Sequence, residues 1–285
     1  MRIDAHQHFW KLDRGDYHWL SSELGILHQD FLPHHLLPRL KEHDIDRTIL
    51  VQAAPTVEET EYMLELYEQN EFIAGVVGWL DLDSSDFPKL FQKYRKHPGF
   101  IGLRPMLQDL QDDRWILREQ VKTNLRILVE HDFPIDILVF PHHLPHIHEL
   151  FLELPNLRAV IDHAAKPPIR EHKLEPWKQQ MAALSRFPKV MCKLSGLITE
   201  AEPDHWTVQD LVPYVHHVFE QFGARRVMFG SDWPVCLLAG NYTEVHEALI
   251  AALPKTLSLE DHTAIFGTNA AAFYQLFKSI PEEEQ

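Results

Sequence analysis

The chain opens with Arg2-Ile3-Asp4-Ala5-His6-Gln7-His8, a short run that predicts a β-strand over residues 2–6 and ends in two histidines. Seven further short runs rich in apolar and β-branched residues follow, and a helix-like segment comes after each run. The predicted strands are residues 2–6, 48–52, 73–79, 99–104, 135–140, 158–161, 190–193 and 226–229. The predicted helices are residues 33–43, 57–70, 87–96, 114–131, 143–154, 173–187, 208–222 and 242–253.

Helical periodicity is clearest in the segment 114–131. Leu117, Val121, Leu125 and Leu128 are spaced at i, i+4, i+8 and i+11, so they share one face of a helix. Eight alternating strands and helices in about 250 residues match the size and order of a (β/α)₈ TIM barrel. An open doubly wound sheet is the alternative, but such sheets usually contain fewer strands. We therefore predict an α/β protein with a (β/α)₈ barrel.

The domain organisation follows from the absence of any linker or low-complexity segment. We expect one domain over residues 1–285, with a disordered acidic tail at residues 281–285. Residues 9–32 are long for a strand-to-helix connection. Long loops after barrel strands usually serve function, so this first-strand loop is expected to cover a substrate as a lid.

Composition excludes several classes of protein. The 285 residues are 45% hydrophobic, which excludes global disorder, and 27 basic against 42 acidic residues give a net charge of −15. Nucleic acid and an anionic membrane surface are therefore not expected as partners.

The expected cellular location rests on the cysteines, on the start of the sequence and on the length of its apolar runs. Cys192 and Cys236 lie in apolar runs without metal-type spacing, so both are expected to be reduced core thiols. The chain has no signal-peptide pattern at its start and no apolar run long enough for a membrane span. A cytoplasmic protein is expected. The oligomeric state is open, and the commonest soluble assembly is a homodimer.

Polar residues stand at the carboxyl ends of the predicted strands. A barrel brings these ends together at one mouth, where its active site forms. Residues at alternate positions of a strand point the same way, so His6 and His8 can reach one small ion or one substrate group. The other candidates at strand ends are Gln52, Trp79, Arg104, Asp162, His163, Lys193 and Asp232.

Each candidate also has a structural interpretation. Asp232, in Gly230-Ser231-Asp232-Trp233-Pro234, suits an Asx-turn as well as a general base for water. Arg104 and Lys193 could each form an internal salt bridge or bind a substrate oxygen. His163 could be a strand-end histidine with ordinary hydrogen-bond partners.

Several motifs together resemble the amidohydrolase superfamily, and within it the amidohydrolase-related group of sugar-acid lactonases and 2-pyrone-4,6-dicarboxylate lactonase. The resemblance covers nearly the whole chain. It rests on residues 1–10 with His6-Gln7-His8, on Val160-Ile161-Asp162-His163 followed by Lys166-Pro167, on Lys193-Leu194-Ser195-Gly196-Leu197, on Phe229-Gly230-Ser231-Asp232-Trp233-Pro234, on the segment 30–53, and on Phe266-Gly267-Thr268-Asn269-Ala270-Ala271.

The resemblance implies a barrel that hydrolyses a small ester or amide ring. His6, His8, His163 and Asp232 match the family's metal-ligand positions and could hold one zinc ion. Arg104 stands where two-metal members carry a bridging lysine or glutamate. The fifth strand ends in Phe140-Pro141, and the two histidines that follow are expected to form a turn and a helix start. One metal is therefore the maximum expected, and a metal-independent mechanism is equally open, because the group includes members without a metal.

The predicted reaction is the opening of an aldonolactone, a sugar-acid lactone, by water that Asp232 activates. Arg104 and the three histidines are predicted to share the catalysis. Alternatives are non-oxidative decarboxylation of a small aromatic or unsaturated acid, and an inactive binding protein on the same barrel. Substrate-binding roles are predicted for Lys193, Gln52, Trp10, Trp79 and Trp233.

Overall fold

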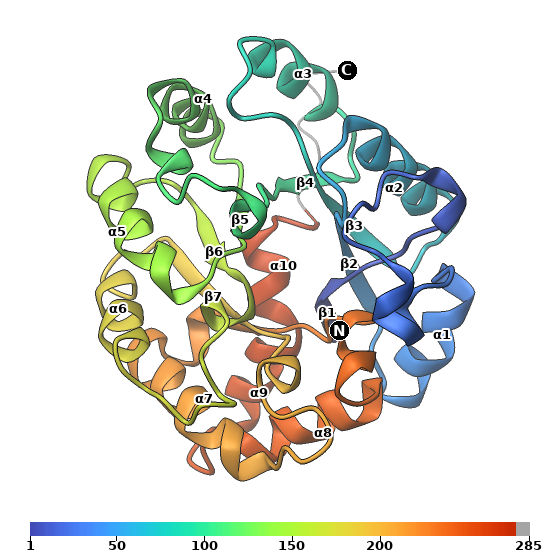
Figure 1. The fold of residues 1–285 in the computed structure, drawn as a ribbon, viewed down its shortest axis with the longest axis vertical. Helices are drawn as coiled ribbons and strands as arrows, with labels where there is room; N and C mark the ends of the chain where they lie inside the picture. The colour runs from blue at the N-terminus through green and yellow to red at the C-terminus, as the bar shows by residue number, and fades with distance from the viewer. Residues whose placement is uncertain (278–285) are drawn as a thin grey trace.

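Eight parallel strands form one sheet in a computed structural model that describes residues 1–277. Each strand pairs with the next one in chain order, and Figure 1 shows them as a ring inside a ring of helices. The strands are β1 (Ile3–Gln7), β2 (Arg47–Val51), β3 (Ile73–Gly78), β4 (Phe100–Leu103), β5 (Ile135–Ile137), β6 (Ala159–Ile161), β7 (Val190–Leu194) and β8 (Val227–Phe229). The predicted (β/α)₈ barrel is confirmed.

Backbone hydrogen bonds beyond β8 bring the end of the sheet to its beginning. The Asp232 amide donates to the His6 carbonyl and the His8 amide donates to the Trp233 carbonyl, each at 2.8 Å. These bonds link the segment after β8 to the carboxyl end of β1 and place Asp232 beside the two histidines.

A helix follows every strand and packs on the outside of the barrel. In α4 the buried Val121, Leu125 and Leu128 form the apolar face that the periodicity predicts. The eight helices are α1 (Pro33–Glu42), α2 (Val57–Gln69), α3 (Phe87–Tyr94), α4 (Glu119–Glu130), α5 (Leu144–Glu153), α6 (Trp177–Leu184), α7 (Val208–Phe222) and α8 (Tyr242–Ala252).

Two predicted helices begin later than expected. Residues 115–117 form a separate 3₁₀ turn, and the extended backbone of Arg118 separates this turn from α4. The helix predicted over residues 173–187 begins only at Trp177, after Pro176, because proline disfavours helical geometry in the residue before it. The strand predicted over residues 135–140 also ends early, at Ile137.

Residues 259–274 close the barrel at its amino-terminal side, which the sequence analysis did not predict. Helix α9 (Leu259–Thr263), a π-helical turn (Ala264–Thr268) and α10 (Asn269–Phe273) follow α8. Phe273 and Tyr274 pack against inward-facing strand residues, and α10 crosses the ring of strands in Figure 1. Asn269 belongs to the motif Phe266-Gly267-Thr268-Asn269-Ala270-Ala271. Its side chain donates to the carbonyls of Ala224 and Val227, so this motif anchors α10 to the start of β8.

The first-strand loop, residues 9–32, is anchored at both ends. Trp10 and Phe31 exchange two backbone hydrogen bonds of 3.0 Å. Trp19 donates its indole hydrogen to the carbonyl of Ala53 at 2.7 Å, which seats the loop over the barrel mouth.

No helix within residues 1–277 is long and apolar enough to cross a bilayer. The tail at residues 281–285 lies outside the described residues.

Candidate active site

A cavity of about 240 Å³ opens at the carboxyl ends of the strands. Of the predicted catalytic residues, His8, Arg104, His163 and Asp232 line it, and His6 lies directly behind them. All five side chains are buried. The structure therefore brings together residues that are up to 226 positions apart in the sequence (232 − 6).

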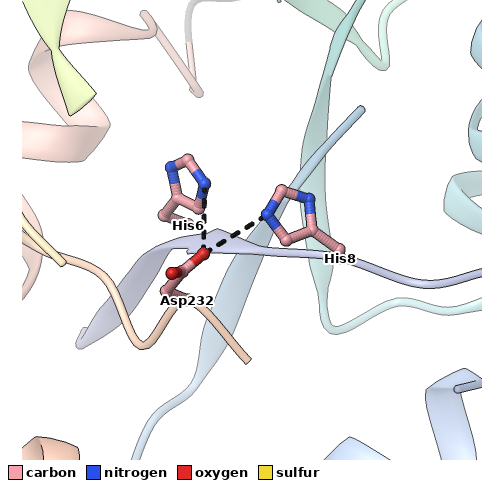
Figure 2. Close-up of side chains that lie close together, drawn as sticks. All are labelled: His6, His8 and Asp232. Carbon is pink, nitrogen blue, oxygen red and sulfur yellow. Dashed lines mark ion pairs between the residues drawn. The ribbon is translucent and has the colours of Figure 1, made fainter. Parts of the chain in front are cut away.

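Asp232 is the centre of this cluster. Its Oδ1 atom lies 3.4 Å from Nε2 of His8 and 3.7 Å from Nε2 of His6. Dashed lines in Figure 2 mark both pairs. The Oδ2 atom of Asp232 lies 4.0 Å from Nδ1 of His163. His6, in β1, and His8, directly after it, face the same carboxylate, in agreement with the two-residue period of a strand.

The hydrogen bonds of His8 determine which ring nitrogen faces Asp232. Its Nδ1 atom lies 2.7 Å from the Val51 carbonyl, which can only accept, so Nδ1 carries the hydrogen. In the neutral ring, the Nε2 lone pair then faces the carboxylate of Asp232. Two acceptors in contact favour a cation between them. Donor atoms of His6, His8 and Asp232 all lie within 4.8 Å of one another, so the cluster fits a divalent metal.

Burial controls the charge of the histidines. It lowers the pKa of His6 and His8, and it lowers the pKa of His163 to about 4, although Asp232 acts in the opposite direction on His8 and His163. Burial also acts to raise the pKa of Asp232. The surrounding histidines outweigh it and hold that pKa below its ordinary value. Asp232 is therefore a carboxylate at neutral pH.

Arg104, directly after β4, is held by Gln52, which follows β2 two strands away in the sheet. Its Nη2 atom donates to the Gln52 carbonyl, and the Gln52 amide donates to the Arg104 carbonyl at 2.9 Å. Nη1 lies 3.4 Å from both Oδ2 of Asp162 and Nε2 of His6. Gln52 thus orients Arg104 from behind, and it does not itself line the cavity.

Gly196 provides space for His163 and Asp232. Its φ is +61°, and a Cβ atom there would lie 2.7 Å from Nδ1 of His163 and 3.0 Å from Oδ2 of Asp232. A displacement of about 1 Å in a catalytic group can lower the reaction rate by about 100-fold. We therefore expect Gly196→Ala to lower kcat/KM by about 100-fold. Gly223→Ala is the control, since Gly223 also has a positive φ but has no atom within 4 Å of a built Cβ. Equal activity losses in the two variants would contradict a role for the contact with His163 and Asp232.

A second cluster lies outside the cavity. Asp113 Oδ1 is 3.6 Å from Nε2 of His142 and 3.4 Å from Nε2 of His143. Nδ1 of His143 accepts the Phe140 amide hydrogen at 3.1 Å, so Nε2 of the neutral ring carries the hydrogen, although it makes no hydrogen bond to Asp113. A protonated nitrogen does not bind a metal. The predicted turn and helix start at these histidines is confirmed.

A family model described as Amidohydrolase matches residues 3–276. The chain belongs to the amidohydrolase family.

Similar proteins support this membership. An L-fucono-1,5-lactonase of Burkholderia ambifaria is 42% identical over 279 residues, 96% of each chain. An L-fucono-1,5-lactonase of Burkholderia multivorans is 35% identical, over 97% of this chain and 96% of its own. A crystal structure of an amidohydrolase from Burkholderia multivorans with bound zinc has a TM-score of 0.92 and 34% identity, covering 96% of this chain and 99% of its own. The predicted resemblance is confirmed.

Lys193 of this amidohydrolase lies beneath the cavity and does not line it. The Nζ atom is fully buried, 2.5 Å from Oδ2 of Asp136 and 3.2 Å from Oδ1 of Asp162. The hydroxyl of Tyr274, beyond α10, donates to Asp136. This geometry makes Lys193 part of an internal ion-pair network and gives no support to the predicted contact with substrate.

The three predicted tryptophans do not line the cavity either. Trp10 is buried among Tyr17, Trp19 and Phe31, and Trp233 packs edge-on against Phe31. Trp79, directly after β3, is partly buried and is not among the lining residues. Trp19, in the first-strand loop, is the tryptophan that lines the cavity.

Several residues that line the cavity of the amidohydrolase were not predicted from the sequence. Lys166 lies in the motif that follows His163, and Trp19 lies in the first-strand loop, so both had a signal in the sequence. Gln108 and Asp109, in the connection after β4, had none, because that connection has no regular pattern.

Proposed function

We propose that this amidohydrolase hydrolyses the lactone of a sugar acid. The observation that carries the proposal is the buried carboxylate of Asp232 in the cavity wall, beside imidazole nitrogens at 3.4–4.0 Å. The similarity to two L-fucono-1,5-lactonases supports this reaction class.

Asp232 acts as the general base. Its carboxylate takes a proton from water, and the water oxygen attacks the ring carbonyl carbon to give a tetrahedral intermediate. The negative charge that develops on the carbonyl oxygen is stabilised by Arg104, which lines the same cavity and whose guanidinium donates to the Gln52 carbonyl. One such donor typically contributes a factor of about 10² to 10³ in rate.

Ring opening completes the reaction. The intermediate breaks its bond to the ring oxygen, which leaves as an alkoxide and takes the proton that the carboxyl group of Asp232 received from water. The product is an open-chain hydroxy acid. It ionises at neutral pH, so each turnover releases one proton to the solution.

We further propose that His6, His8 and Asp232 can hold a divalent metal such as zinc, with His163 beside them. A metal ion bound there would lower the pKa of water and polarise a carbonyl.

Zinc binding provides the test of this metal site. His8→Asn keeps an amide donor for the Val51 carbonyl and removes the Nε2 ligand, so we expect it to weaken zinc affinity by more than about 10-fold. Zinc content after dialysis against a zinc buffer, measured by mass spectrometry, is the readout. His142→Asn, in the exposed cluster, is the control. Equal zinc content in wild type and His8→Asn would contradict the site.

The reaction is tested by proton release with a panel of 1,4- and 1,5-aldonolactones, before and after chelation of metals. Turnover of one stereochemical series supports the proposal, and the chelated sample shows whether a metal is required. An inactive panel together with carbon dioxide release from a hydroxybenzoate would favour the decarboxylase alternative. Binding of sugar acids without turnover of any lactone would favour the binding protein. A cytoplasmic location and a homodimer stay predictions.

A further inference from the structure

The cavity has two chemically different sides. Trp19 and Leu24 come from the first-strand loop, and Val235 and Leu238 come from the 3₁₀ helix η9 (Val235–Leu238) after β8. The loop's own 3₁₀ helix η2 (Ser22–Leu27) contacts η9, so these four apolar residues form one side.

The opposite side is more polar. In the ring of strands, β4 and β5 lie across from the junction of β1 and β8, and β6 is next to β5. Gln108 and Asp109 follow β4, and Lys166 follows β6, and all three line the cavity. Met106 and Leu138 are the apolar residues on this side.

A strained turn presents Lys166 to the cavity. His163, Ala164, Ala165 and Lys166 have consecutive positive φ values of 53°, 48°, 59° and 51°. Left-handed helical geometry is strained for residues that carry a Cβ atom. The turn is stabilised by a 2.8 Å hydrogen bond from the Lys166 amide to the His163 carbonyl and by a 2.7 Å bond from the Trp177 indole to the Ala164 carbonyl. Strain of this kind concentrates at functional sites, and here it places His163 and Lys166 in the same cavity.

Lys166 has hydrogen-bond donors available for a ligand. Its Nζ atom donates to Oε1 of Gln108 at 2.6 Å and lies 5.0 Å from the centre of the Phe140 ring. Within residues 1–277, no carboxylate oxygen lies within 4.0 Å of Nζ. An ammonium group has three donors, so the bond to Gln108 leaves capacity for oxygen atoms of a ligand.

The surrounding charge favours neutral oxygen atoms. Asp109 and Asp232 line the same cavity and balance the charges of Arg104 and Lys166, and Glu200 lies near enough to Lys166 and Asp232 to interact electrostatically. A carboxylate on the ligand would face these acids, whereas a hydroxyl group would not be repelled.

We propose that Lys166 and Gln108 bind ring or side-chain hydroxyl groups of the lactone and thereby select hydroxylated over unsubstituted lactones. The apolar side then contacts the hydrocarbon edge of the same ring. This inference rests on the proposed lactone hydrolysis.

The test compares two substrates in one variant. We expect Lys166→Met to lower kcat/KM for a polyhydroxylated 1,5-aldonolactone by about 10- to 100-fold, mainly through KM, because a hydrogen bond from a charged donor is lost. For δ-valerolactone, which has no hydroxyl group, the decrease should be less than about three-fold. If δ-valerolactone is not turned over, its inhibition constant against the aldonolactone gives the comparison.

Lys173→Met is the matched control, because Lys173 is exposed in the segment after Lys166 and does not line the cavity. Thermal unfolding of each variant checks the fold. An equal loss on both substrates would assign Lys166 to the reacting carbonyl and overturn the proposal, as would no loss on either. A larger loss on a carboxylate-bearing lactone would show an anion site instead. Failure of lactone hydrolysis itself would already be visible in the wild type.

Discussion

Replacing Asp232 by asparagine is expected to lower kcat for lactone hydrolysis by about 10²- to 10⁴-fold, the usual contribution of a general base. An amide of nearly the same shape cannot accept the proton of the attacking water. The backbone should be unaffected, because Asp232 has a φ of +56° and asparagine tolerates this region well. Steady-state kinetics by proton release, with circular dichroism and thermal unfolding on the same samples, measure both effects.

Asp113→Asn is the control for this experiment. Asp113 also faces two histidines but lies in the exposed cluster outside the cavity, so its loss should leave kcat unchanged. A folded Asp232→Asn protein that keeps kcat within about five-fold of the wild type would rule out Asp232 as the base.

Lys193→Met should destabilise the protein by about 3–5 kcal/mol, because it leaves buried carboxylates without their cation. Nζ of Lys193 pairs with Asp136 at 2.5 Å and with Asp162 at 3.2 Å, and all three side chains are fully buried. The free energy of unfolding from urea denaturation is the measurement. Lys189→Met is the control, since Lys189 pairs with Asp132 at the surface and should contribute less than about 1 kcal/mol.

The pH dependence provides a second check of the same network. Burial already raises the pKa of Asp136 to about 6, above the value of 3.8 that applies to the unfolded chain. Loss of Lys193 should raise this pKa further. A raised carboxyl pKa means that the folded state binds the proton more tightly, so stability decreases as pH rises from the unfolded to the folded pKa. The loss of unfolding free energy in Lys193→Met should therefore be smaller at pH 6 than at pH 8. A loss that is independent of pH would contradict this explanation.

The sequence determined the order of strands and helices, because hydrophobic periodicity and turn residues are local signals. Parallel strands of a barrel end at one mouth, so the polar residues at strand ends could be predicted to converge there. His6, His8 and Asp232 confirm that convergence, with donor atoms within 4.8 Å of one another. The closing helices α9 and α10 were not predicted, since their short segments have little periodicity of their own.

Only the tertiary structure decided which strand-end side chains reach the cavity. Lys193 and Gln52 follow the same pattern as Arg104, yet one pairs with Asp136 and the other holds the Arg104 backbone. Trp10 and Trp19 lie in the same loop, and only Trp19 lines the cavity. The physical reason is that the direction of each of these side chains depends on partners far away in the sequence, in other strands and loops. Strand periodicity predicts only the face of its own strand on which a residue lies.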